Sequence, residues 1–80
     1  MKLISRAMCS GCIEAKAILK SQDIEYIEYD TQTIDGMALL SRYFDGPDTL
    51  LPAIICESHK DMEIIWELLP DVNVAVSRTW

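Results

Sequence analysis

The chain has 80 residues, of which half are hydrophobic, and its seven basic and 13 acidic residues give a net charge of −6. This length predicts one domain, residues 1–80, with a small core, and the apolar content excludes a disordered chain. Acidic residues spread along the sequence argue against nucleic acid or an anionic membrane as a partner. The apolar runs are too short for a signal peptide or a membrane span. We therefore expect a cytoplasmic protein, and we also expect a monomer.

The N-terminal half predicts strands and helices in alternation. A short apolar strand covers Lys2–Ser5, and a helix follows from residue 10 to about residue 22. The buried stripe of that helix begins at Cys12 and continues through Ala15, Ile18 and Leu19. Residues 25–30 alternate and are rich in Tyr and Ile, which indicates a second strand. Threonines 31 and 33 are good N-caps for a second helix over residues 34–44, with Met37, Leu40 and Phe44 as its apolar stripe.

The C-terminal half is harder to assign. Residues 45–48 end the helix in a loop, residues 52–56 predict a buried strand, and residues 58–61 predict a turn. The segment 62–68 fits a strand and a helix equally well, and a turn of about four residues favours the strand, in a hairpin. Trp66 is expected in the core and Trp80 at the chain terminus. Pro70 then begins a closing helix with Val72, Val76 and Thr79 inward, although valines disfavour a helix.

These elements predict an α/β fold of order β-α-β-α-β-β-α. Helices join the first three strands, so strand–helix–strand units with right-handed crossovers are expected there. The last two strands are expected to form an antiparallel hairpin. The result is one four-stranded mixed sheet with helices on its faces.

The motif with the most chemical content is Cys9-Ser10-Gly11-Cys12, between the first strand and the first helix. Two cysteines separated by two residues can close a small reversible disulfide, and a helix N-terminus favours a thiolate at the first of them. In a reducing compartment such a pair is more often catalytic or metal-binding than structural. Because Cys12 aligns with the buried stripe, we expect an exposed nucleophile at Cys9 and a buried resolving thiol at Cys12.

Two other interpretations of the motif stay open. Cys9, Cys12, Cys56 and His59 together supply three sulfurs and one nitrogen, the ligand set of a structural zinc site. Otherwise Cys56 is a small buried apolar side chain and His59 a solvated turn residue. The third interpretation is a non-catalytic interaction domain that retains a vestigial pair of cysteines.

At these residues the chain resembles the glutaredoxins, within the thioredoxin-fold group. The resemblance rests on the order strand, Cys9-x-x-Cys12, helix; on Arg6, where glutaredoxins usually carry Lys; and on Leu51-Pro52, which opens the third strand. It implies a thioredoxin-like fold and a cis peptide between Leu51 and Pro52 beside the cysteines. It also implies a thiol–disulfide oxidoreductase that reduces protein disulfides through a redox-active Cys9–Cys12 disulfide, with no other cofactor and no metal.

The resemblance has departures that bear on the reductant. Ser10 and Gly11 replace the family's Pro and aromatic residue, and Leu50 and Leu51 replace Thr-Val before the proline. The Gly-Gly pair that helps to hold glutathione in the family is missing. We therefore expect substrate contacts from Arg6, Ser10, Gly11, Leu51 and Pro52, and poor reduction by glutathione. Glutathione or a thioredoxin reductase is the expected electron donor, and the compact size resembles small bacterial and phage proteins that feed electrons to ribonucleotide reductase.

Overall fold

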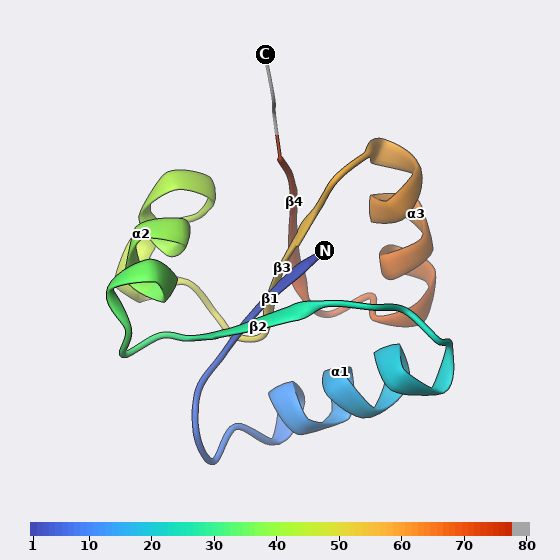
Figure 1. Cartoon of the computed structure of the whole chain (residues 1–80), viewed down its shortest axis with the longest axis horizontal. Coiled ribbons are helices and arrows are strands. Elements are labelled where there is room, and N and C mark those ends of the chain that lie inside the picture. Colours follow the sequence, from blue (N-terminus) through green and yellow to red (C-terminus); the bar gives the residue numbers. More distant parts are fainter. Residues whose placement is uncertain (78–80) are drawn as a thin grey trace.

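A computed structural model describes residues 1–77. Strands and helices alternate along the whole chain (Figure 1). In chain order the elements are β1 (Lys2–Ser5), α1 (Ser10–Ser21), β2 (Ile27–Asp30), α2 (Ile34–Tyr43), the short 3-10 helix η1 (Gly46–Asp48), β3 (Ala53–Cys56), α3 (His59–Leu68) and β4 (Asn73–Val76).

The four strands form one mixed sheet in the order β2-β1-β3-β4. β1 runs parallel to β2 and antiparallel to β3, with Leu3 opposite Glu28 on one side and Ile54 on the other. β3 and β4 run parallel. The protein is therefore an α/β fold with a four-stranded mixed sheet and flanking helices, as the sequence predicts, and the arrangement is compatible with a thioredoxin-like fold.

The predicted order of the last elements is wrong. Residues 59–68 form helix α3 instead of a turn and a strand, and Asn73–Val76 form a strand instead of a closing helix, so the order is β-α-β-α-β-α-β. The Ser58 hydroxyl caps α3 by accepting the Asp61 N–H at 3.2 Å. Ile65 and Leu69, which are four residues apart, are both buried, as on one face of a helix, whereas Trp66, expected in the core, is 49 % exposed.

The predicted hairpin is likewise replaced by a parallel crossover. Parallel strands need a long connection, and α3 supplies it. The β-branched residues Val74 and Val76 suit the strand that follows. Thr79 and Trp80, which the sequence placed inward and at the chain terminus, lie outside the described residues.

The helices cover the sheet on both faces. α1 and α3 pack on one face and α2 packs on the other (Figure 1). Successive side chains of β3 point to opposite faces of the sheet, so this strand contributes to the core on both faces. Ile54 packs on the face covered by α1 and α3, and Ile55 packs on the face covered by α2. The sequence correctly places Leu40 and Cys56 in the core, but Met37, expected in the buried stripe of α2, is 57 % exposed.

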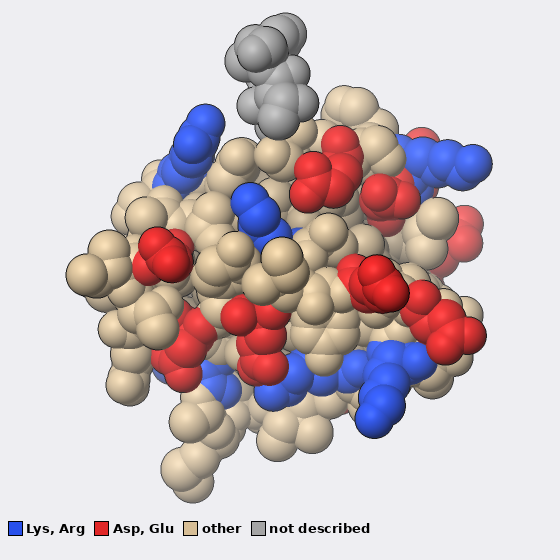
Figure 2. Space-filling view, in the orientation of Figure 1, with Lys and Arg blue, Asp and Glu red and all other residues tan. Residues whose placement is uncertain are grey.

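Charged side chains cover much of the surface. Figure 2 shows acidic side chains scattered across the face drawn, with several basic ones along its lower edge, where α1 lies in Figure 1. Among residues 1–77 no helix has the length and apolar character to cross a membrane.

Candidate thiol–disulfide site

Cys9 is both a thiol and a helix cap. It directly precedes α1 with an extended backbone, and its Sγ accepts the backbone N–H of Cys12 at 3.3 Å. Its carbonyl accepts the N–H of Ile13 at 3.1 Å, which begins the helix. The sulfur therefore occupies the position where a helix N-terminus stabilises negative charge. Met8, which precedes it, adopts a left-handed backbone with φ of 60° and is 99 % exposed.

The two cysteines of the motif lie in different environments. Cys9 is half-buried rather than exposed, and Cys12 is fully buried, as its place in the helical stripe predicts. They form a close pair at 2.6 Å, and both are free thiols. Two free thiols this close to each other are candidates for a reversible disulfide.

The environments move the two pKa values in opposite directions. The hydrogen bond from the Cys12 thiol lowers the pKa of Cys9, with smaller contributions from the Cys12 N–H and the positive charge of Arg6. Burial raises the pKa of Cys12 to about 11, and its hydrogen bond to Cys9 adds to the shift. Of the two thiols, Cys9 therefore ionises at the lower pH.

The proline loop lies against the cysteine motif. The Leu51–Pro52 peptide is cis, as the resemblance implies, and Pro52 is buried while Leu51 is half-buried. A Cβ atom added to Gly11 would lie 3.3 Å from Cδ of Pro52 and 3.9 Å from the carbonyl oxygen of Leu51. A side chain at position 11 would therefore press on the Pro52 ring, which would have to shift by a few tenths of an ångström.

A residue that the sequence did not suggest holds the proline loop in place. The side-chain Nδ2 of Asn73 donates to the carbonyl of Leu50 at 2.7 Å, and its backbone N–H donates to the carbonyl of Pro52 at 3.4 Å. Leu51 lies between these two anchors, and its own N–H and C=O have no hydrogen-bond partner within residues 1–77. The sequence does not indicate this contact, because its pattern predicts a helix at Asn73 rather than a strand beside Pro52.

Of the residues expected to contact the substrate, Arg6 and Ser10 are more exposed to solvent than Gly11, Leu51 and Pro52. Both are exposed, Ser10 as the first residue of α1. A cavity of about 270 Å³ on the α2 side brings Arg6 together with Leu51 and with Thr49, whose buried hydroxyl has no partner within residues 1–77. The positive charge of Arg6 acts on Cys9, and Gly11, Leu51 and Pro52 lie close together beside the motif.

An ion pair joins α1 to β2, one helical turn from Cys12. Lys16 donates from Nζ to Oε2 of Glu28 at 2.9 Å, and the buried Ser5 donates its hydroxyl to the same oxygen at 2.7 Å. The hydrogen bond from Ser5 and then that from Lys16 lower the pKa of Glu28. Lys16 is one helical turn from Cys12, and its charge favours the Cys12 thiolate, opposing part of the effect of burial.

The alternative zinc site is not formed. Cys56 is at the far end of β3 from Pro52, four residues or about 13 Å along the strand, and is therefore remote from Cys9 and Cys12. His59 is exposed at the start of α3. Within residues 1–77 no group of three or more His, Cys, Asp or Glu side chains could hold a metal ion.

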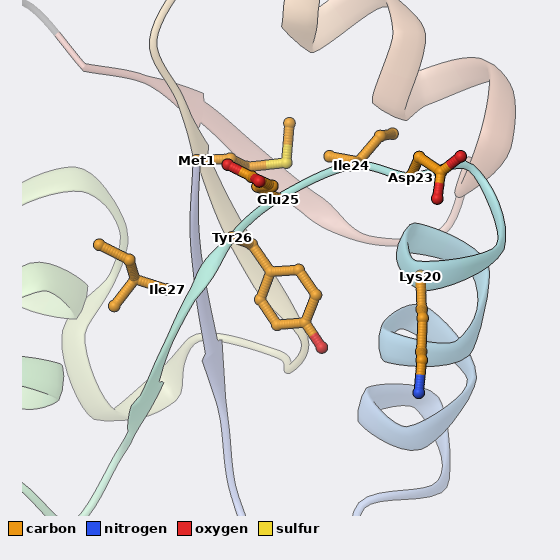
Figure 3. A pocket seen from close by; sticks show the side chains of 7 residues that line it. All are labelled: Met1, Lys20, Asp23, Ile24, Glu25, Tyr26 and Ile27. Carbon is orange, nitrogen blue, oxygen red and sulfur yellow. The ribbon is translucent and has the colours of Figure 1, made fainter.

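A large hollow in the surface is unrelated to the thiols. It encloses about 810 Å³ at the C-terminal end of α1, and its lining includes Met1, Lys20 and Tyr26 but no cysteine. Figure 3 shows Tyr26 reaching from the segment before β2 toward α1, which carries Lys20. The candidate site is therefore the smaller surface at the opposite end of α1, where Cys9 caps the helix.

Comparisons with protein-family models, with curated proteins and with solved structures find no match. Inference about function therefore starts from the residues of the site and from the resemblance of its motif.

Proposed function

We propose that this chain is a glutaredoxin-like oxidoreductase that reduces protein disulfides through a reversible Cys9–Cys12 disulfide. The observation that carries the proposal is the asymmetry of the two thiols. Cys9 caps α1 and has a lowered pKa, whereas Cys12 is fully buried with a pKa of about 11. A thiolate is the nucleophile in disulfide exchange, so this asymmetry favours Cys9 as the attacking group.

The first step forms a mixed disulfide. The Cys9 thiolate attacks one sulfur of the substrate disulfide, an S–S bond forms to Cys9, and the substrate S–S bond breaks. The second substrate sulfur leaves as a thiolate and takes a proton from solvent. The unpartnered N–H and C=O of Leu51 are placed to pair with the extended backbone of the substrate during this step.

The second step releases the product. Cys12 loses its proton and attacks Sγ of Cys9, which forms the Cys9–Cys12 disulfide and expels the remaining substrate thiolate. The substrate gains two electrons and, with solvent protons, two S–H bonds, and the protein dithiol is oxidised by two electrons. Once Cys9 is in a mixed disulfide, it no longer carries a negative charge opposing ionisation of Cys12, and the Lys16 charge favours that ionisation.

A dithiol or thiol reductant must return the protein to its starting state. Glutathione or a thioredoxin reductase fits this role, in the cytoplasm, and the resemblance adds ribonucleotide reductase as a possible acceptor of the electrons. Glutathione is anionic, the chain carries −6, and the family's glutathione-holding residues are replaced. We expect faster reduction by a thioredoxin reductase than by glutathione, measured as steady-state rates with each donor.

Reduction of insulin disulfides with dithiothreitol as donor tests the proposal. Wild-type protein should accelerate the reaction, Cys9→Ser should be inert, and Cys12→Ser should accumulate a mixed disulfide visible by mass spectrometry. Cys56→Ser is the matched control, because Cys56 is buried in the core at the opposite end of β3 from Pro52. Equal rates with wild type and Cys9→Ser would favour a non-catalytic interaction domain.

A further inference from the structure

A groove leads from the cysteine motif to the connection between α3 and β4. It encloses about 340 Å³, and its near end is formed by Gly11, Leu51 and Pro52. Its far end comes from Ile18 of α1 and from residues 68–72, the segment that the sequence had predicted as a hairpin strand and a closing helix. The groove therefore shares Gly11 and the proline loop with the candidate site, although neither Cys9 nor Cys12 lines it, and its far half depends on the parallel crossover.

The lining of this groove combines apolar and acidic side chains. Leu68 and Val72 are half-buried, so part of each apolar side chain faces the groove or solvent. Glu14 and Asp71 line the same groove and are exposed. Neither carboxylate belongs to an ion pair within residues 1–77, where the pairs are Met1–Glu57 and Lys16–Glu28. Among residues 1–77 no basic side chain lines the groove.

We propose that this groove binds an extended segment of the substrate protein that carries an apolar residue and a Lys or Arg beside its reactive cysteine. The inference rests on the proposed function, because the groove begins at Gly11, between the two cysteines in the sequence. Leu51 supplies the backbone N–H and C=O for strand-like pairing. The apolar residue contacts Leu68 and Val72, and the basic residue approaches Glu14 and Asp71.

Charge complementarity decides in favour of a basic peptide. A surface with two carboxylates and no cation on a chain of net charge −6 attracts a basic segment and repels an acidic one. Glutathione offers neither an apolar side chain nor a net positive charge. The same groove therefore discriminates between a protein substrate and the small thiol.

The test uses peptides that bind without redox chemistry. Three ten-residue peptides carry Ser in place of the cysteine and differ only in the two residues beside it, Leu-Lys, Leu-Glu and Ser-Lys. Titration into the isotopically labelled full chain, followed by NMR amide shifts, should give the tightest binding for Leu-Lys and shifts centred on residues 11–18 and 68–72. Glu14→Gln and Asp71→Asn should each raise the dissociation constant for Leu-Lys by about two- to five-fold.

Glu25→Gln is the matched control, because it removes the same charge at the other end of α1, in the large hollow. It should leave the dissociation constant unchanged, and the preference for Leu-Lys should shrink at high salt. Equal affinity for the three peptides, no saturable shift at millimolar peptide, or shifts centred on residues 20–27 would overturn the inference. Shifts at the groove that appear with protein concentration alone would assign it to a second copy of the chain instead.

The outcome is separable from that of the proposed function. Insulin reduction without a peptide preference would contradict the groove and leave the redox activity standing. Selective binding of Leu-Lys without insulin reduction would support the groove as a peptide site and contradict the redox activity.

Discussion

Sγ of Cys9 accepts the backbone N–H of Cys12 at 3.3 Å, so the first thiol of the motif caps the helix that buries the second. The first turn of α1 thus influences the ionisation of both thiols. The helix N-terminus stabilises a thiolate at Cys9, and the same helix carries Cys12 into the core against the sheet. A change that lengthens or disorders the first turn of α1 would affect both thiols together.

Alkylation by iodoacetamide should follow these environments. Cys9 should react first at neutral pH, because its pKa is lowered whereas that of Cys12 is about 11. The pH midpoint of Cys9 alkylation should rise in Arg6→Ala and rise further in Cys12→Ala, since the Cys12 thiol is the larger cause of the shift. Faster alkylation of Cys12 than of Cys9 in the wild type would contradict the assignment of nucleophile and resolving thiol.

Asn73 should act as a positioning residue for the proline loop. Asn73→Asp keeps the shape but removes the donor to the Leu50 carbonyl, and a lost hydrogen bond of this kind costs about 0.5–1.5 kcal/mol. We expect KM for a protein disulfide to rise about two- to ten-fold with a smaller change in kcat. The Cys9 alkylation rate should stay constant, because Asn73 does not contact the thiols.

Gln32→Glu serves as the control for Asn73→Asp, since it adds the same charge at an exposed position. An equal rise of KM in both variants would mean that net charge, rather than the anchor on Leu50, determines the effect.

The sequence predicts the first five elements well because each carries a local signal. Thr33 caps α2 by accepting the Gly36 N–H at 3.1 Å, and the apolar run before Cys56 becomes a strand buried on both faces. Cys12 follows the helical stripe into the core. In these segments local propensity and burial agree, so the pattern alone identifies the element.

The last third of the chain could not be assigned in this way. Ile64 and Trp66 fit a strand pattern, and Ile65 and Leu69 fit a helix pattern, so local periodicity does not decide. The tertiary packing of Ile65 and Leu69 with Leu3 and Ile54 decides for the helix. The far end of the groove and the Asn73 anchor both depend on residues 59–68 forming a helix. The sequence therefore identifies the thiols but not the part of the neighbouring surface that residues 68–73 form.

Stability of the reduced protein should fall as pH rises above 9. Burial raises the pKa of Cys56, as of Cys12, from 9.0 to about 11. Between these values the unfolded chain releases thiol protons that the folded chain retains, so the free energy of unfolding decreases with pH. The stabilisation is complete below pH 9 and is lost as pH approaches 11.

Cys56→Ala isolates one thiol from the other groups that titrate in this range. Urea unfolding at pH 8 and at pH 10.5 should show a smaller loss of stability in this variant, by about 1–2 kcal/mol. The comparison is between two pH values within each protein, so the constant cost of the smaller side chain cancels. An identical pH dependence in wild type and Cys56→Ala would show that Cys56 is not buried in a low-dielectric core.

Gly36→Ala should destabilise the protein although Ala is the better helix former. Gly36 is in the first turn of α2, where helix propensity alone predicts a gain of about 1 kcal/mol. A methyl group there would meet the carbonyl carbon of Asp30 at 2.9 Å and its oxygen more closely still, with the capping Thr33 hydroxyl at 3.1 Å. These are backbone and cap atoms, so relief requires α2 to move away from the end of β2. Overpacking of this kind costs about 1–3 kcal/mol, so we expect net destabilisation in urea unfolding, while Ala38→Gly should lose only about 1 kcal/mol, the propensity term. An increase in stability on Gly36→Ala would mean that α2 is free to shift, and the cavity lined by Arg6, Met37 and Leu51 would then change shape with it.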